Sequence, residues 1–257
     1  MFNLWEGLWM VYSRWGKNVA SVAAFLSFFV LFEGCFKSIT TSNASRTSAG
    51  DPDESGMAGF SGGSIPGPVS VSPTLRSVTP LVRSYSERYN LDWVLVLALV
   101  RQESGFDHGA VSHRGAYGLM QLMPTTQIEL TEKLGMDEAM TPANNIRAGI
   151  YHLKTLYEYF DQAPKADRIR LSLAAYNAGL GRIIDAQRIA EYLGNDPNSW
   201  EAVRDAMPYL SKKYYTLHAS IWTEKKPSSG YMRNYRETQQ YVDGVIRHYE
   251  DYSLAVR

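Results

Sequence analysis

The apolar positions of the chain predict a mainly helical domain. Residues 91–101 read LDWVLVLALVR, and a segment that is apolar on all sides is typical of a buried central helix. Ile146 and Ile150 recur at helical spacing behind Thr141 and Pro142, which suit an N-cap and a first helical residue. Further helices are expected from residue 124 onward and over residues 167–178, 180–193, 200–207 and 234–252. No alternating strand pattern stands out, so the predicted fold class is mainly α.

The N-terminal residues have a different pattern. Residues 19–32 read VASVAAFLSFFVLF, a run of 14 without a charge. A membrane-spanning helix needs about 20 apolar residues, whereas a signal peptide needs roughly 7–15 behind a basic flank. Arg14 and Lys17 supply that flank. The run is therefore interpreted as an export signal rather than as a buried core helix, because the residues after it give it nothing to pack against.

Cys35 follows this run directly, in Leu31-Phe32-Glu33-Gly34-Cys35. The arrangement resembles a bacterial lipoprotein signal, in which the cysteine becomes the lipidated first residue. Gly34 suits the small residue before the cysteine, whereas Phe32 and Glu33 depart from the usual small, apolar pattern. The resemblance makes Cys35 the candidate lipidation site.

Two alternatives to lipidation remain open at the N-terminus. The chain could keep an uncleaved anchor extended by the tryptophans Trp5, Trp9 and Trp15, or it could be cleaved further on, near Ala44. All three readings make residues 1–36 a signal peptide or a membrane or lipid anchor. All three also place the remainder in the bacterial cell envelope, on the outer side of the cytoplasmic membrane.

A flexible linker is expected between this anchor and the folded domain. Of the 36 residues from 38 to 73, 22 are Ser, Gly, Thr or Pro. Such a stretch buries too little apolar area to offset its backbone entropy. We therefore assign residues 37–75 to a linker and residues 76–253 to one catalytic domain.

Charge and composition exclude several classes of protein. The chain has 26 basic and 26 acidic residues, so it lacks the basic field that duplex nucleic acid requires. A hydrophobic content of 45% excludes a wholly disordered chain. One cysteine excludes an internal disulfide framework and a cysteine-rich zinc site. The five histidines show no metal-ligand spacing, and neither a metal nor a cofactor is expected.

Glu103 is the first candidate for catalysis. It ends the apolar helix, and Ser104-Gly105 breaks that helix. Desolvation raises the pKa of a carboxyl group, and the partial negative charge of a helix C-terminus raises it further. A carboxyl group that stays protonated near neutral pH suits a general acid. Taken alone, Glu103 would more simply be a solvated helix end.

Four motifs change that interpretation. They are Glu103-Ser104, residues 112–124 (SHRGAYGLMQLMP), residues 174–179 (AAYNAG) and residues 237–242 (ETQQYV). Together, in this order and spacing, they resemble the soluble lytic transglycosylase (SLT) catalytic domain. The resemblance covers about residues 81–249 and implies a lysozyme-like, goose-type-like helical fold.

The resemblance assigns roles residue by residue. It makes Glu103 the catalytic acid, and it places seven residues at the substrate: Ser112, Gln121, Met123, Tyr176, Asn177, Glu237 and Tyr241. Gln121 has both a donor and an acceptor for sugar groups. Ordinary roles stay open for some of them: core filling for Met123, a helix end for Asn177, a surface carboxylate for Glu237 and core packing for Tyr241.

The resemblance also implies a reaction. Glu103 protonates the glycosidic oxygen between N-acetylmuramic acid and N-acetylglucosamine in peptidoglycan. It then accepts the proton of the C6 hydroxyl, which closes a 1,6-anhydro ring without water or metal. Glycosidases otherwise use two carboxyl groups, and Asp107 and Glu237 are the candidates for a second one. A hydrolytic muramidase and a non-catalytic wall-binding module are the alternatives. The expected partners are glycan strands, the membrane and an unidentified envelope or secretion machine.

Overall fold

The structure is a computed structural model, and it describes residues 73–136 and 141–255. The predicted anchor, Cys35 and nearly all of the predicted linker lie outside the described residues, and the proposed domain boundaries stay a prediction. The described elements are α3 (Pro73–Arg88), α4 (Trp93–Ser104), α5 (Pro124–Leu134), α6 (Pro142–Tyr159), α7 (Lys165–Ala178), α8 (Leu180–Tyr192), α9 (Trp200–Ala206), the 3-10 turns η2 (Met207–Leu210) and η3 (Lys212–Tyr214), α10 (Tyr215–Ile221) and α11 (Tyr235–Ala255). Extended pairing in these ranges is limited to isolated bridges. The mainly α prediction is confirmed.

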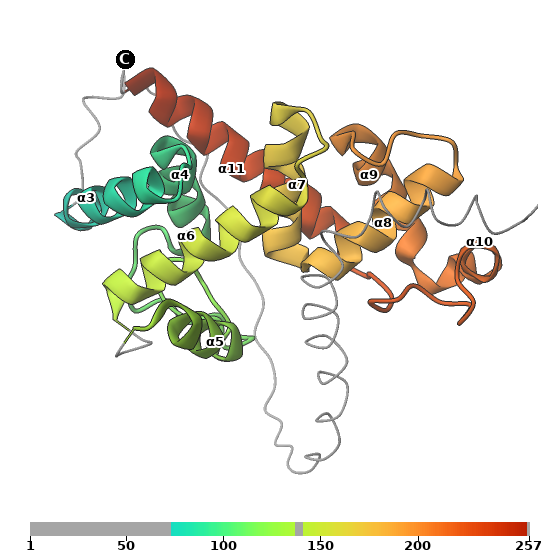
Figure 1. Ribbon diagram of the computed structural model, residues 1–257, viewed down its shortest axis with the longest axis horizontal. Coiled ribbons are helices and arrows are strands. Elements are labelled where there is room, and N and C mark those ends of the chain that lie inside the picture. The colour runs from blue at the N-terminus through green and yellow to red at the C-terminus, as the bar shows by residue number, and fades with distance from the viewer. Residues whose placement is uncertain (1–72, 137–140, 256–257) are drawn as a thin grey trace, which may run out of the picture. The chain divides into compact units, whose positions relative to one another are not determined.

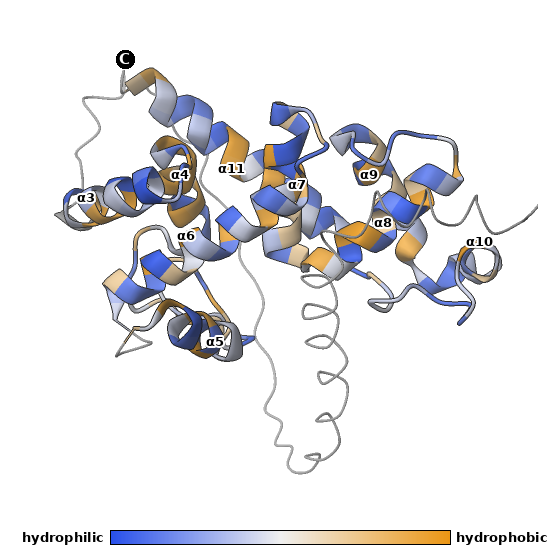
Figure 2. Cartoon of the chain, in the orientation of Figure 1, coloured by the Kyte–Doolittle hydropathy of each residue, from blue (hydrophilic) through white to orange (hydrophobic). Residues whose placement is uncertain are grey.

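Helix α4 is the central element of the core, as its sequence predicts. Every side chain from Val94 to Val100 is buried, and hydrophobic residues dominate the helix in Figure 2. Asp92 caps its start, because its Oδ1 accepts a hydrogen bond from the Val94 N–H at 2.9 Å. Gly105 ends it in the left-handed conformation, with φ 60°. The helix therefore presents Glu103, its penultimate residue, at a fixed end.

Helix α11 packs along α4 and brings the end of the chain back to the start of the domain (Figure 1). The backbone of α11 at Gly244 lies against the side chain of Gln102, because an added Cβ there would lie 2.6 Å from Gln102 Oε1. Gln102 precedes Glu103. This packing therefore brings a face of α11 against the end of α4.

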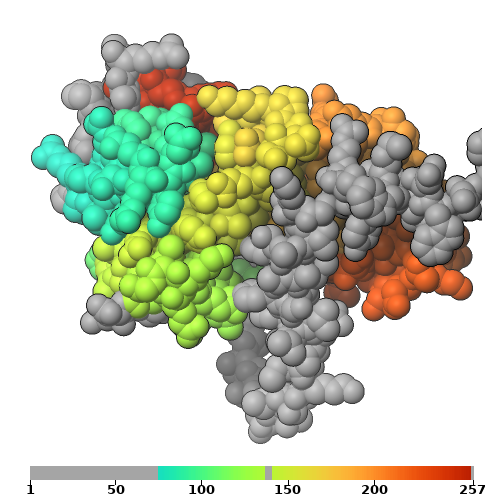
Figure 3. Space-filling model, viewed as in Figure 1, coloured from blue at the N-terminus to red at the C-terminus, as the bar shows by residue number. Residues whose placement is uncertain are grey.

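Helices α3, α6 and α7 form the neighbouring layer. Helix α6 packs against both α3 and α7, and these helices lie side by side in the space-filling view (Figure 3). Thr141 caps α6 by accepting a hydrogen bond from the Asn144 N–H at 3.2 Å, and Pro142 is its first residue. The expected start of α6 is thus confirmed.

Two helices, α3 and α10, are absent from the sequence-based prediction. Helix α3 contains Pro80, which lacks an amide donor and disfavours a helix interior. The helix forms because Val78 and Val82 are buried in the core. Tertiary packing thus outweighs the local signal.

A buried asparagine organises the loop between α4 and α5. Asn145 of α6 accepts a hydrogen bond from the Met120 N–H at 2.9 Å and donates to the Tyr117 carbonyl at 3.0 Å. Its amide also donates to Gln127 Oε1 at 2.7 Å. Gly118 has a φ of 81°, and a Cβ there would lie 2.7 Å from Asn145 Cγ. The absence of a side chain at Gly118 therefore admits Asn145.

Candidate active site

Glu103 lies at the end of α4 in a largely buried position. Burial raises the pKa of its carboxyl group from 4.5 to about 7, and a hydrogen bond from Tyr241 opposes part of that rise. The increase expected from the sequence is thus confirmed, with desolvation as its main cause. At neutral pH a substantial fraction of Glu103 is therefore protonated, as a general acid requires.

Tyr241 is the direct partner of this carboxyl group. It is buried in α11, and its hydroxyl donates a hydrogen bond to Glu103 Oε1. Burial, followed by the charge of Glu103, raises the pKa of Tyr241 well above 10. The phenol therefore stays protonated and can donate its proton to the hydrogen bond with the carboxylate. It holds the carboxyl group in one orientation.

Tyr176 approaches the same carboxyl group from α7 but bonds elsewhere. Its hydroxyl donates to the Met120 carbonyl at 2.8 Å. Burial raises the pKa of Tyr176 well above 10, and the charge of Glu103 adds to the rise. Tyr176 thus ties α7 to the loop that faces Glu103.

His152 lies behind Tyr176, and none of the sequence motifs placed it near the site. Its ring centroid is 5.3 Å from that of Tyr176. Burial lowers the pKa of His152 to about 4, so the imidazole is neutral when Glu103 titrates. The only sequence signal was that His152 lies on the helix in which Ile146 and Ile150 recur at helical spacing.

The loop residues Ser112 and Gln121 have structural partners. Ser112 Oγ accepts a hydrogen bond from the Ala116 N–H at 3.0 Å. The Gln121 amide donates to the carbonyls of Ala110 at 3.0 Å and Gly118 at 2.9 Å. Both side chains hold the loop in shape, and the two donors of Gln121 are occupied.

Three other predicted site residues lie at the surface. The Met123 side chain, just before α5, is 38% exposed, so it does not fill the core. Asn177 Oδ1 accepts a hydrogen bond from Thr238 at 2.9 Å, and Glu237 Oε1 accepts one from Asn234 at 3.0 Å. Asn177 thereby joins the end of α7 to the start of α11.

The two candidate second carboxylates differ from Glu103. Asp107 is exposed and its Oδ1 accepts the Gly109 N–H at 2.8 Å, in a local turn. Glu237 is also exposed. Burial and Tyr241 account for the pKa of Glu103, with no contribution from either carboxylate. Within residues 73–136 and 141–255, no group of three or more His, Cys, Asp or Glu side chains is arranged to hold a metal ion.

Comparison with known proteins identifies the class of this domain. Residues 80–197 match the family model of the transglycosylase SLT domain. Residues 80–197 are thus a transglycosylase SLT domain, in agreement with the resemblance of the motifs, and the described part of this domain is mainly helical. Glu103, residues 112–124 and the Tyr176-Asn177 pair all fall within the matched range.

Individual relatives agree with this assignment. A membrane-bound lytic murein transglycosylase F of Desulfosudis oleivorans is 34% identical over 173 residues, which are 66% of this chain and 35% of the relative. The protein of that name in Vibrio cholerae is 35% identical over 180 residues, 69% of this chain and 32% of the relative. The chain thus spans about a third of the length of these relatives.

A solved structure is also similar in sequence. The lytic transglycosylase Slt of Pseudomonas aeruginosa, in an inactive mutant form, is 31% identical over 72% of this chain and 25% of that protein, with a TM-score of 0.45.

Among the described helices of the present chain, none is long and apolar enough to cross a membrane.

Proposed function

We propose that the protein is a peptidoglycan lytic transglycosylase in which Glu103 is the single catalytic acid and base. The observation that carries the proposal is the largely buried carboxyl group of Glu103 at the end of α4, which Tyr241 holds by a hydrogen bond and whose pKa is raised to about 7. The names of the curated relatives, lytic murein transglycosylases, support the substrate.

The reaction needs one group that first donates and then accepts a proton. Glu103 protonates the oxygen between N-acetylmuramic acid and N-acetylglucosamine, and that bond breaks. The carboxylate then takes the proton of the C6 hydroxyl, whose oxygen bonds to C1 of the same muramic acid residue and closes the 1,6-anhydro ring. A pKa near 7 suits both steps, because neither protonation state is costly at neutral pH.

Substrate contacts are proposed for the residues around Glu103. The exposed Met123 side chain offers an apolar surface to a sugar ring. Ser112 and Gln121 retain acceptor lone pairs for sugar hydroxyl or amide groups. Asn177 and Glu237 are exposed at the ends of α7 and α11. Tyr176 and Tyr241 act differently in this proposal, since they fix the loop and the acid.

Muropeptide analysis tests the reaction. The full chain digests purified peptidoglycan, and the released products are weighed by mass spectrometry before and after borohydride reduction. We expect products about 18 Da lighter than hydrolysis products, because no water is added, and they should not take up hydrogen. Glu103→Gln, which keeps the size of the side chain, should release nothing.

Other outcomes select the alternatives. Reducible ends would show that water is the nucleophile, and the protein would be a muramidase with Asp107 or Glu237 as the second carboxylate. Binding to peptidoglycan by both proteins, with no product from the wild type, would indicate a wall-binding module.

The proposed location is the cell envelope, with residues 1–36 as signal or anchor and residues 37–75 as linker. The relatives named membrane-bound support this location. Metabolic labelling with a radioactive fatty acid tests lipidation: Cys35→Ala should abolish the label and move the protein from the membrane to the soluble fraction. Unchanged fractionation without label would favour an uncleaved anchor.

A further inference from the structure

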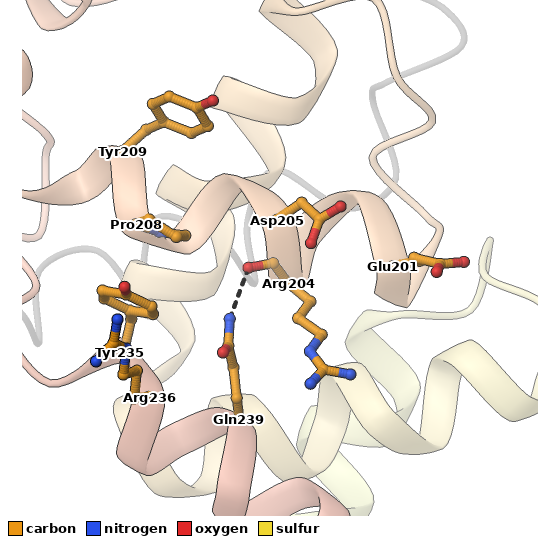
Figure 4. Close-up of a pocket in the computed structure, with 8 residues that line it drawn as sticks. All are labelled: Glu201, Arg204, Asp205, Pro208, Tyr209, Tyr235, Arg236 and Gln239. Carbon is orange, nitrogen blue, oxygen red and sulfur yellow. Dashed lines mark hydrogen bonds between the residues drawn. The ribbon is translucent and has the colours of Figure 1, made fainter.

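A hollow lies between α9, η2 and the first turns of α11 (Figure 4). Its volume is about 590 Å³, within the range of roughly 300–1,000 Å³ that is typical of small-molecule sites. It contains none of the residues that the SLT motifs assign to the substrate. None of the site residues described above assigns a function to this hollow.

The hollow has two chemically different ends. Tyr209, Tyr235 and Arg236 lie toward one end, and Glu201 and Asp205 project from α9 at the other (Figure 4). The guanidinium carbon of Arg236 lies 5.7 Å from the centroid of the Tyr235 ring. One end therefore offers a cation beside aromatic surface, and the other offers two carboxylates.

These charges are available to a ligand. Arg204 lies near Asp243, with Nη2 and Oδ2 3.6 Å apart, so its charge is partly balanced. No ion pair among the described residues includes Arg236, Glu201 or Asp205. A ligand with a carboxylate and an ammonium group at a distance from each other would complement both ends.

The hollow is separate from the surroundings of Glu103. Gln239 lines it and lies two residues before Tyr241, so their side chains project from nearly opposite faces of α11, roughly 200° apart. Gln239 also donates a hydrogen bond to the Arg204 carbonyl at 2.9 Å, which fixes α9 against α11. The same helix thus presents one face to the acid and another to the hollow.

We propose that this hollow binds the peptide stems of peptidoglycan, with a stem carboxylate at Arg236 and a stem ammonium group at the Glu201 and Asp205 end. The choice of ligand rests on the proposed function, because the glycan strand itself offers no ammonium group whereas its short peptides carry both charges. Binding here holds the wall beside the enzyme without touching the reacting atoms. The site therefore affects KM for peptidoglycan and leaves kcat unchanged.

A glycan-free peptide tests the site apart from catalysis. The probe is the tetrapeptide L-alanyl-γ-D-glutamyl-meso-diaminopimelyl-D-alanine, titrated into the full chain by calorimetry. Arg236→Gln should weaken binding about tenfold, as expected for the loss of one charge-assisted hydrogen bond. Asp205→Asn should weaken binding of the tetrapeptide acetylated at its N-terminus, in which diaminopimelate supplies the ammonium group, but not binding of the form acetylated on both amines. The matched control is Arg83→Gln, whose exposed arginine pairs with Glu87 on α3.

The outcomes separate this proposal from the proposed function. Equal binding by wild type, Arg236→Gln and Arg83→Gln would overturn the stem site, as would loss of tetrapeptide binding in Glu103→Gln, which would place the peptide beside the acid. The probe contains no glycosidic bond, so arginine-dependent binding by a protein that releases no muropeptides would reject the lyase activity and retain the site. Because Arg236 is exposed, its substitution should leave the fold intact. Circular dichroism would verify the fold of each variant.

Discussion

The hydroxyl of Tyr241 donates a hydrogen bond to Glu103 across 138 residues of sequence. The bond joins the C-terminal end of α4 to the middle of α11, at the place where these helices pack against each other. Because a phenol can only donate to a carboxylate at neutral pH, the contact favours the charged form of Glu103 and opposes the effect of burial. The pKa of Glu103 is thus set by two opposing effects: burial at the end of α4 raises it, and the hydrogen bond from Tyr241 of α11 lowers it.

Tyr241→Phe removes one side of this balance. The pKa of Glu103 should then increase above about 7, because the hydrogen bond that lowers it is lost. Since the proposed reaction needs protonated Glu103, the alkaline limb of the pH–rate profile should move up by about one pH unit, and kcat should fall because the carboxyl group loses its orientation. The measurement is the pH dependence of peptidoglycan turnover.

Tyr252→Phe is the matched control for this change, because Tyr252 lies on the same helix and is half-buried. Its pH profile should coincide with that of the wild type. An unchanged alkaline limb in Tyr241→Phe would show that the hydrogen bond does not set the pKa of the acid.

Sequence alone could predict the helix that holds Glu103 but not the partner of its carboxyl group. The apolar run of α4 and the Thr141 cap of α6 are local signals, and both are confirmed. The family resemblance placed Tyr176 and Tyr241 at the site. Which of the two reaches Glu103 depends on the way α11 crosses α4, and no local pattern carries that information.

Gly118 provides a second example of this limit. A glycine leaves space beside the backbone for a close neighbour, and the structure shows the Asn145 amide in that space. The close neighbour lies 27 residues away in the chain. A positive φ can be anticipated from glycine in a loop, but the crowding partner comes only from the fold.

Gly118→Ala should therefore destabilise the protein more than Gly115→Ala. Both glycines have a positive φ, 81° and 83°, so both variants carry the same backbone strain. Only at residue 118 would the new Cβ meet other atoms, 2.7 Å from Asn145 Cγ, whereas nothing lies within 4 Å at residue 115. Gly115→Ala should cost about 1 kcal/mol and Gly118→Ala at least about 2 kcal/mol more. Chemical denaturation measures both, and equal losses would contradict the crowding.

Asp92 should stabilise the start of α4 through two bonds at once. Its Oδ1 accepts the Val94 N–H at 2.9 Å, and its Oδ2 accepts the Tyr249 hydroxyl at 2.7 Å. Asp92→Ala should cost about 1–2 kcal/mol of unfolding free energy, since it removes a helix cap, and Tyr249→Phe should cost less. The double variant should cost less than the sum, because both single changes remove the same hydrogen bond. Additive losses would show that the Tyr249 bond contributes nothing.

Glu103 and His152 should give opposite pH dependence to stability in overlapping ranges. The pKa of Glu103 is raised from 4.5 to about 7, so between these values the folded state holds a proton that the unfolded chain releases, and stability falls as the pH rises. The pKa of His152 is lowered from 6.5 to about 4, so in that range the unfolded chain binds the proton and stability rises with pH. Each effect is on the order of 3 kcal/mol over its full range, and they nearly cancel between pH 4.5 and 6.5.

Single substitutions should expose each effect. In Glu103→Gln the unfolding free energy should rise with pH up to about 7 relative to the wild-type curve, because the opposing effect of Glu103 is lost. In His152→Gln it should fall with pH up to about 6.5 relative to the wild type, because the effect of His152 is lost. Urea unfolding at a series of pH values between about 4.5 and 7.5 gives the slopes, and groups common to all three proteins cancel in the differences. Parallel curves would show that neither side chain is as strongly desolvated as its position indicates. Opposite slopes would show that His152 offsets the pH dependence that Glu103 gives to the unfolding free energy.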